Sequence, residues 1–286
     1  MPLPSVFTAF QSTWLAVSLS ALLCLGASPA LAEGGAPPPA REGVDVGRNS
    51  AFAKLVPAED IEVSANKQYL SMLKQAADKS ALAPPDHPQV QRLRRIAKDL
   101  IPFAMEWNPR ARNWKWEINL LGSKQINAFC MPGGKIAFYS GILDQLQLSD
   151  DEVAQVMGHE IAHALREHAR ARMGKGAATQ IGAGILSQVL GLGDLGRTVT
   201  NYGVELLTLK FSRDDETEAD LVGLELAARA GYDPRAGVTL WRKMQAANKG
   251  APPQWLSTHP AGNTRIADIE KALPQVLPLY ERAERK

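Results

Sequence analysis

The sequence has little cysteine: among its 286 residues, only Cys24 and Cys130 carry a thiol. Cys24 lies in an apolar N-terminal segment that we expect to be removed, and one remaining cysteine cannot form an internal disulfide. The chain is long enough to bury a stable core without covalent cross-links. No motif around Cys130 indicates a nucleophile, so we expect this residue to act as a small buried apolar side chain.

An excess of charge of one sign is also missing. The 32 Lys and Arg residues nearly balance the 30 Asp and Glu residues, which gives a net charge of +2 at pH 7. This balance provides no electrostatic reason to expect a nucleic-acid partner or a strongly anionic surface as partner. The hydrophobic fraction of 45% is typical of a globular protein.

Residues 1–32 contain no Lys, Arg, Asp or Glu. An apolar run from Trp14 to Leu25 precedes Ala30-Leu31-Ala32, a small-residue pattern typical of signal-peptide cleavage sites. We predict an export signal over residues 1–32, cleaved after Ala32, although its start lacks the usual positive charge. An uncut membrane anchor is the alternative, which the shortness of the apolar run disfavours. An exported chain without disulfides fits a bacterial periplasm.

Two further regions follow this signal. Residues 33–65 begin with a stretch rich in glycine and proline, which predicts a flexible leader. Residues 66–286 are predicted to form one folded domain. Helical spacing marks residues 66–79 and a second helix that runs from about Pro88 to about Met105.

Three segments show strand patterns instead. Apolar and polar residues alternate from Trp114 to Leu120, which predicts a strand with one buried face. The segments that flank Pro132-Gly133-Gly134 resemble the arms of a β-hairpin, because this tripeptide favours a tight turn. The rest is mostly helical, so the predicted fold class is α+β, mainly helical, with a small β-sheet.

Residues 176–193 carry no charge. Their length borders on the minimum for a membrane-spanning helix, but five glycines and four polar side chains interrupt them. We therefore expect an apolar helical hairpin that packs on the domain or lies against a membrane or a substrate.

The segment VMGHEIAHALREH, residues 156–168, holds three of the five histidines. His159 and His163 lie four residues apart, so on a helix they project from one face and can reach a single metal ion. Glu160 can reach a water molecule on that ion without being a ligand. This is the H-E-x-x-H arrangement. His168 follows His163 by five residues and is expected to be turned off this face and solvated.

The helix that carries this motif has clear end signals. Ser149 and Glu152 have the spacing of a capping box, and acidic residues suit a helix N-terminus. Basic residues gather toward the other end. We therefore expect one continuous helix from Asp151 to Met173.

A third ligand is needed, because catalytic zinc usually takes three protein ligands and one water molecule. Glu216 and Asp220 are also four residues apart and share a face of another predicted helix. We predict that Glu216 binds the metal and that Asp220 accepts the free ring N–H of His159. Glu218 points roughly to the other side of that helix. A solvated acidic helix start is the alternative, but it does not explain the pairing with H-E-x-x-H.

The chain resembles the zinc peptidases of the family of the CAAX prenyl protease and the HtpX heat-shock protease. The resemblance rests on H-E-x-x-H followed by SRDDETEAD, on NAFCMPGGKIAFYSGIL before the motif, and on GYDPRAGVTLWRKM and LSTHPAGNTRIADI after it. It extends from about Asn66 to Leu273. The several membrane spans of those two proteases have at most weak counterparts here, so the chain is most similar to the compact exported members.

This resemblance implies a zincin-type fold and a zinc-dependent endopeptidase with one Zn²⁺ per chain. His159, His163 and Glu216 would bind the metal, which activates a water molecule. Glu160 would take the proton of that water and deliver it toward the leaving amine.

Two further residues receive roles from the resemblance. His259, in STHP, matches the family position that stabilises the developing oxyanion, although a structural histidine before Pro260 is nearly as good an interpretation. Arg213 either orients Glu216 or Asp220 or is an ordinary surface charge.

Substrate binding is expected at the hairpin. A peptide must lie extended across such a site, and an exposed strand edge provides main-chain hydrogen bonds with little side-chain selectivity. The strand that contains Asn127, Ala128 and Phe129 is the candidate, with Asn127 and Ala128 as substrate-binding residues. Phe129 is expected to be simply buried.

These observations predict an exported metallopeptidase, soluble in the periplasm or loosely attached to a membrane, that acts on unfolded or misassembled envelope proteins. One alternative is a chaperone-like protein that binds metal but cuts little, against which the intact Glu160 argues. Another is a membrane-embedded protease of lipid-modified substrates.

Overall fold

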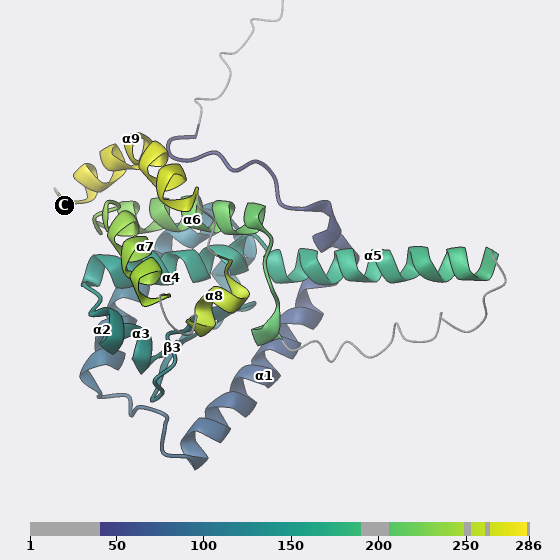
Figure 1. The fold of residues 1–286 in the computed structure, drawn as a ribbon, viewed down its shortest axis with the longest axis horizontal. Helices are drawn as coiled ribbons and strands as arrows, with labels where there is room; N and C mark the ends of the chain where they lie inside the picture. The colour runs from purple at the N-terminus through teal and green to yellow at the C-terminus, as the bar shows by residue number, and fades with distance from the viewer. Residues whose placement is uncertain (1–40, 190–205, 249–252, 261–263, 285–286) are drawn as a thin grey trace, which may run out of the picture. The chain divides into compact units, whose positions relative to one another are not determined.

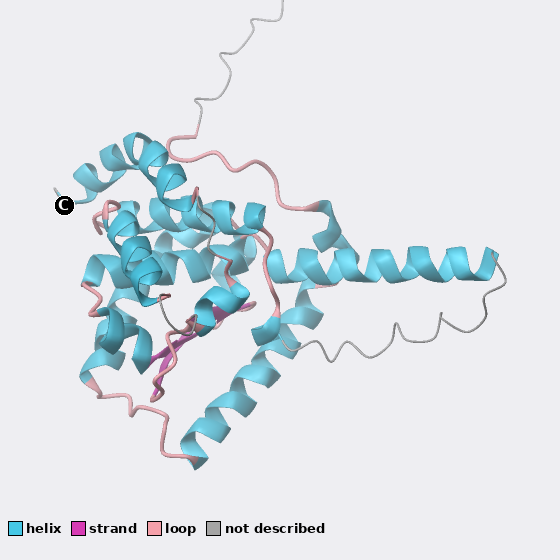
Figure 2. Ribbon diagram, in the orientation of Figure 1, coloured by secondary structure: helices cyan, strands magenta, loops and turns pink. Residues whose placement is uncertain are grey.

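The structure is a computed structural model of the chain. It describes residues 41–189, 206–248, 253–260 and 264–284. The described residues are mainly helical, with one small β-sheet, which confirms the predicted fold class (Figure 2). The predicted signal peptide and its cleavage site lie outside the described residues.

The sheet contains strands β1 (Glu117–Leu121), β2 (Ala128–Met131) and β3 (Lys135–Tyr139) in the order β1-β3-β2. Strands β2 and β3 are antiparallel and form the predicted hairpin, while β1 pairs with β3 in parallel. Gly133 and Gly134 in the turn have φ angles of +84° and +77°, which favour glycine. Strand β2 therefore forms one edge of this sheet.

Regular structure starts earlier in the chain than the sequence indicates. A short helix, η1 (Ala51–Leu55), precedes helix α1 (Ala58–Asp78), so the predicted leader and the predicted helix start at residue 66 both differ from the structure. Within the leader, Val44 is buried and donates its N–H to Glu225 Oε2 at 2.8 Å. From Glu42 onward the chain belongs to the same compact unit as the rest.

The second predicted helix and the first predicted strand agree with the structure, with shifted ends. Helix α2 (Pro88–Leu100) stops before Pro102, which lies in the 3-10 helix η2 (Ile101–Glu106). A further 3-10 helix, η3 (Pro109–Asn113), delays β1 to three residues after the predicted strand start at Trp114. Strand β3 leads directly into helix α3 (Ser140–Leu146).

The predicted continuous helix from Asp151 to Met173 is wrong. The chain forms helix α4 (Asp150–Leu165), turns at Arg166 and Glu167, and continues as helix α5 (His168–Val189). Glu167 has a φ angle of +57°, a left-handed conformation that ends the first helix. The break directs α5 against η1 and changes the position of His168 relative to the H-E-x-x-H motif.

Helix α5 includes the first part of the uncharged segment, residues 176–193. The rest of the predicted apolar hairpin lies outside the described residues. None of the described helices is both long enough and apolar enough to cross a membrane.

Helix α6 (Arg213–Arg229) lies directly beside α4 (Figure 1). Gly158 and Gly223 meet at the contact, and a Cβ atom on Gly223 would lie 2.5 Å from the backbone nitrogen of His159. The two backbones therefore touch at the residue that begins the H-E-x-x-H motif. The remaining described elements are η4 (Leu206–Thr208), α7 (Ala236–Ala247), α8 (Gln254–Thr258) and α9 (Arg265–Glu284).

Gly223→Ala is expected to destabilise the protein, because the new methyl group meets backbone atoms that cannot move without separating α4 from α6. Overpacking of this kind typically costs about 1–3 kcal/mol, measurable by urea unfolding. Gly176→Ala is the control: nothing lies within 4 Å of its added Cβ. The control is expected to gain up to about 1 kcal/mol, because alanine favours a helix. An unchanged stability of the Gly223→Ala variant would contradict the expected clash.

Candidate metal centre

Helix α4 presents the residues of the H-E-x-x-H motif toward the interior. Its start is held by the predicted capping box: the Ser149 side chain accepts the N–H of Glu152, and Glu152 accepts the N–H of Ser149. His159, Glu160 and His163 are all at most 3% exposed. A polar group this deeply buried needs a partner, so these three side chains require an explanation beyond a solvated helix face.

Helix α6 supplies the predicted acidic pair. Ser212 and Asp215 cap its first turn in the same reciprocal way as at α4. Glu216 and Asp220 are buried on the face that meets α4. Glu218 does not point to the other side of α6 as the spacing predicts: it accepts from Arg166 at the end of α4 and lies outside the group of donor atoms.

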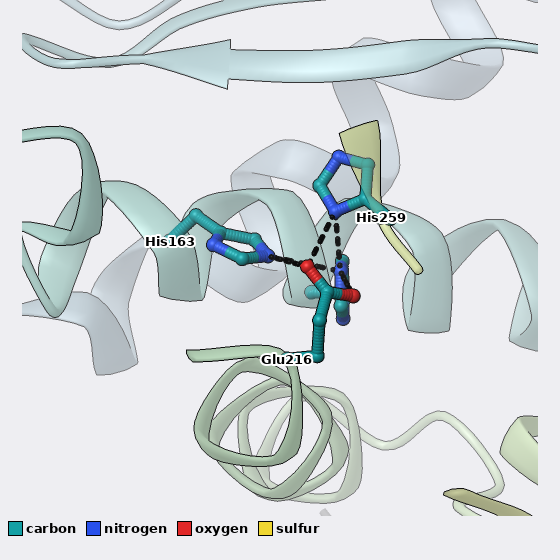
Figure 3. Close-up of side chains that lie close together, drawn as sticks. His163, Glu216 and His259 are labelled. Atoms are coloured by element: carbon teal, nitrogen blue, oxygen red, sulfur yellow. Dashed lines mark hydrogen bonds and ion pairs between the residues drawn. The ribbon is translucent and has the colours of Figure 1, made fainter. Parts of the chain in front are cut away.

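Side chains from three separate segments converge between the two helices (Figure 3). The Nε2 atoms of His159 and His163 lie 3.1 Å apart, and the Glu216 carboxylate lies 3.6 Å from the first and 3.4 Å from the second. His259 Nδ1 lies 3.0 Å from Glu216 Oε1 and 3.3 Å from His159 Nε2. One donor atom from each of these four residues falls within 4.8 Å of all the others.

This spacing fits a tetrahedral metal site. Ligand distances of about 2.0–2.1 Å for zinc place two neighbouring donor atoms roughly 3.3 Å apart. Nitrogen and carboxylate oxygen are both normal zinc ligands. The donor set and its dimensions therefore match a zinc ion.

The hydrogen-bond roles of His159 also favour a cation. Its Nδ1 lies 3.0 Å from Asp220 Oδ1, and this carboxylate can only accept, so Nδ1 carries the proton. In the neutral ring Nε2 has only a lone pair, which faces the second histidine and the Glu216 carboxylate. Burial also holds the pKa of His163 well below its usual value, which keeps this ring neutral as a ligand requires.

Arg265 is a component of the site that the sequence reading missed. Its guanidinium donates to both Glu216 and Asp220 and lies 3.7 Å above the Trp241 ring. Arg213, which we considered for this orienting role, is exposed at the start of α6. Nothing local in the sequence marks Arg265, because it lies 45 residues from Asp220 and reaches it only through the packing of α9 on α6.

Burial would raise the pKa of Glu216, but the neighbouring His259 and His163 outweigh this effect and hold it well below its usual range. Burial acts the same way on Asp220, where Arg265 outweighs it and lowers the pKa. Both carboxyl groups are thus charged, as a metal ligand and its supporting acceptor must be.

Glu160 lies beside the donor cluster, next to His259. Trp255, also missed from the sequence, donates its indole N–H to Glu160 Oε1 at 2.6 Å. His259 Nε2 lies 3.6 Å from the same oxygen. The oxyanion role of His259 stays a prediction, and its position among the donor atoms adds the role of a fourth ligand as an alternative.

His168 is not solvated, contrary to the sequence expectation. It is 3% exposed, because the left-handed turn at Glu167 brings it back against His163. The Nδ1 atoms of the two rings lie 2.9 Å apart, and His168 Nε2 lies 3.3 Å from Glu218 Oε2. It does not belong to the group of four donors, so the expectation that it is no ligand agrees with the geometry.

The edge strand β2 lines a cleft that leads to this cluster. Asn127, Ala128 and Cys130 border the same cavity as Glu160 and His163. Cys130 is half-buried at this wall, and burial raises the pKa of its thiol well above the usual value. The apolar part of the cavity wall is contributed by Ala128, Phe129, Met131, Leu206, Leu207, Leu209 and Phe211.

Comparison with known families agrees with this arrangement. The model of "Peptidase family M48" matches residues 88–273, which include every residue of the donor cluster. The chain belongs to peptidase family M48. The predicted family resemblance is therefore confirmed; the match ends at Leu273 as predicted and starts at residue 88, later than the predicted Asn66.

Several curated relatives of this M48 chain are similar in sequence. "Mitochondrial metalloendopeptidase OMA1" of Schizosaccharomyces pombe is 33% identical over 74% of this chain and 60% of its own length. The human "Metalloendopeptidase OMA1, mitochondrial" is 31% identical over 64% of this chain and 38% of its own length. The "Beta-barrel assembly-enhancing protease" of Escherichia coli is 33% identical over 56% of this chain and 35% of its own length. The chain thus spans less than two thirds of the length of these relatives.

Arg265→Leu in this M48 chain leaves two carboxylates buried without their shared cation. Breaking a buried ion pair in this way typically costs about 3–5 kcal/mol, which we expect to observe in urea unfolding with a chelator present. Arg242→Leu is the control, because its ion pair with Glu270 is exposed on both sides. Such a pair contributes at most about 1 kcal/mol. Equal losses for the two variants would contradict a special role of Arg265.

Proposed function

We propose that this chain is a zinc-dependent metalloendopeptidase that binds one Zn²⁺ through His159, His163 and Glu216. The observation that carries this proposal is the spacing of the donor atoms of His159, His163 and Glu216, which suits tetrahedral coordination, with the buried Glu160 beside them. Family membership supports it, as do relatives that are named metalloendopeptidases.

The proposed reaction is the hydrolysis of a peptide bond. When bound, the zinc ion polarises a water molecule and the substrate carbonyl. Glu160 accepts the proton of the water on its carboxylate and then delivers it to the leaving amine. The indole N–H of Trp255 holds one oxygen of Glu160, which fixes the direction in which the carboxylate points. The proposed role of His259, whose Nε2 lies 3.6 Å from Glu160 Oε1, is to donate to the oxygen that gains charge.

The edge of strand β2 is the proposed substrate platform. The C=O of Asn127 accepts the N–H of Tyr139 at 3.0 Å, so alternate residues from Asn127 onward direct their backbone groups toward β3. Ala128 and Cys130 direct theirs toward the open edge. The Ala128 N–H is occupied by the Asn127 side chain, which leaves Cys130 as the edge residue best placed to pair with an extended peptide.

The proposed substrates are unfolded or misassembled envelope proteins of a bacterium, met in the periplasm after export. Main-chain recognition at a strand edge requires an extended segment, which folded proteins rarely expose. The name of the Escherichia coli relative, which links a protease of this family to β-barrel assembly, supports the same setting.

Glu160→Gln tests the reaction. Removing the general base is expected to lower the rate of casein hydrolysis by about 10²–10⁴-fold while zinc still binds. A chelator is expected to abolish hydrolysis, and added zinc to restore it. Glu270→Gln, an exposed position on α9, is the matched control and should leave the rate unchanged.

Hydrolysis by the Glu160 variant or the chelated protein at the wild-type rate would contradict the proposal. Zinc binding without any cleavage by the wild type would instead favour the chaperone-like alternative.

Cys130→Pro tests the substrate platform, because it removes one edge N–H. Loss of a single hydrogen bond is expected to lower kcat/KM for a peptide substrate by about 2- to 10-fold relative to Cys130→Ala, which keeps the N–H. The zinc affinity of both variants should equal that of the wild type. If the Pro and Ala variants have the same kcat/KM, peptides do not pair with this edge.

A further inference from the structure

A second buried polar group lies behind the donor cluster and takes no part in the reaction described above. It consists of His168 at the start of α5, Glu218 on α6 and Arg166 between α4 and α5. Arg166 and His168 are at most 4% exposed. Burying a cation and a histidine costs free energy unless they form hydrogen bonds with one another or with other groups. Their burial therefore needs a structural explanation.

The hydrogen bonds of this group form one continuous series in which the donor and acceptor roles are mutually consistent. The Nε2 of His163 faces Glu216 and His159, so its Nδ1 faces backward, where it lies 2.9 Å from His168 Nδ1. A ligating Nε2 has a lone pair, which places the ring proton on Nδ1 of His163. His168 Nδ1 must then accept, which places its own proton on Nε2, and that nitrogen lies 3.3 Å from Glu218 Oε2. Each donor in this chain meets an acceptor.

Glu218, the last acceptor in this series of hydrogen bonds, is also held in place. Arg166 Nε donates to the same Glu218 oxygen at 2.8 Å. The remaining guanidinium nitrogens donate to the carbonyl oxygens of Gly47 and Val46 at 3.1 and 3.3 Å. Glu218 is therefore a carboxylate fixed between two donors, not a freely rotating surface side chain.

Packing alone does not determine which nitrogen of His163 faces the metal site, whereas this series of hydrogen bonds does. The His163 ring is stacked on Phe211, with ring centroids 4.0 Å apart, which restricts the tilt of the imidazole plane. Stacking is nearly indifferent to a half-turn of the ring, which would exchange the carbon and nitrogen positions. A hydrogen bond at Nδ1 distinguishes the two orientations, because only one of them places Nε2 at the metal.

We propose that His168 is a positioning residue of the metal centre: it accepts the Nδ1–H of His163, passes the hydrogen bond on to Glu218, and so holds His163 Nε2 toward the metal. His168 would fix the tautomer and orientation of His163, as Asp220 would fix those of His159. This inference rests on the proposed metal site.

The test measures zinc affinity by competition with a chromophoric chelator in the full chain. His168→Phe keeps the size of the ring but removes the acceptor, and is expected to bind zinc about 10- to 100-fold more weakly. His168→Asn keeps an acceptor near the Nδ1 position and is expected to recover most of the loss. His87→Asn, at the histidine that caps α2, is the matched control and should bind as the wild type does.

Two further measurements separate positioning from general destabilisation. The visible absorption bands of bound Co²⁺ report ligand geometry, and we expect them to change in His168→Phe and to return toward wild type in His168→Asn. Circular dichroism of the metal-free variants reports folding. If His168→Phe does not fold, Glu218→Leu takes its place, because it removes the acceptor for His168 at a partly exposed position and should weaken zinc binding in the same direction.

The outcomes distinguish this inference from the proposed function. A wild type that binds no zinc would overturn both. A wild type that binds zinc, with folded His168→Phe or Glu218→Leu of equal affinity and an unchanged Co²⁺ spectrum, would overturn the positioning role and leave the metal site intact.

Discussion

The close approach of α4 and α6 at Gly158 and Gly223 is the constraint on which the rest of the site depends. One helix carries both histidines of the motif and the other carries Glu216, so the distance between the helix axes sets the distance between the ligands. Any side chain at the contact would separate the backbones by more than a metal–ligand bond can tolerate. Two residues without side chains thus determine whether donors from two helices can share one ion.

Bringing these donors together creates an electrostatic problem that other segments solve. Glu216 and Asp220 add two negative charges to a buried region, and Arg265 from α9 lies against both. The stacking of Arg265 on Trp241 fixes the guanidinium where the carboxylates need it. The candidate metal site therefore draws on more than the two helices that meet at the glycines: α9 supplies the cation that neutralises the carboxylates of α6, and α7 orients this cation through Trp241.

The parts of this site that depend on helical spacing could be predicted from the sequence, and the parts that depend on packing could not. His159 with His163, and Glu216 with Asp220, are pairs four residues apart, so local geometry alone gives each pair a common face. The hairpin was predictable because Gly133 and Gly134 indicate a turn. Arg265 and Trp255 come from segments that meet the site only in the folded chain. His168 was misjudged because Glu167 adopts a left-handed conformation, which a non-glycine residue rarely does.

That same turn at Glu167 has a mechanical consequence. In a continuous helix, any rotation or bending of residues 168–189 would be transmitted directly to His159 and His163, since a helix is stiff along its length. A left-handed residue interrupts the hydrogen-bond ladder between the two segments, so α5 is coupled to His163 through the side chain of His168 at its first position and not through a continuous helix backbone. A displacement of the uncharged stretch that begins at Gly176 would therefore reach the donor atoms through one side-chain hydrogen bond and not through a stiff helix.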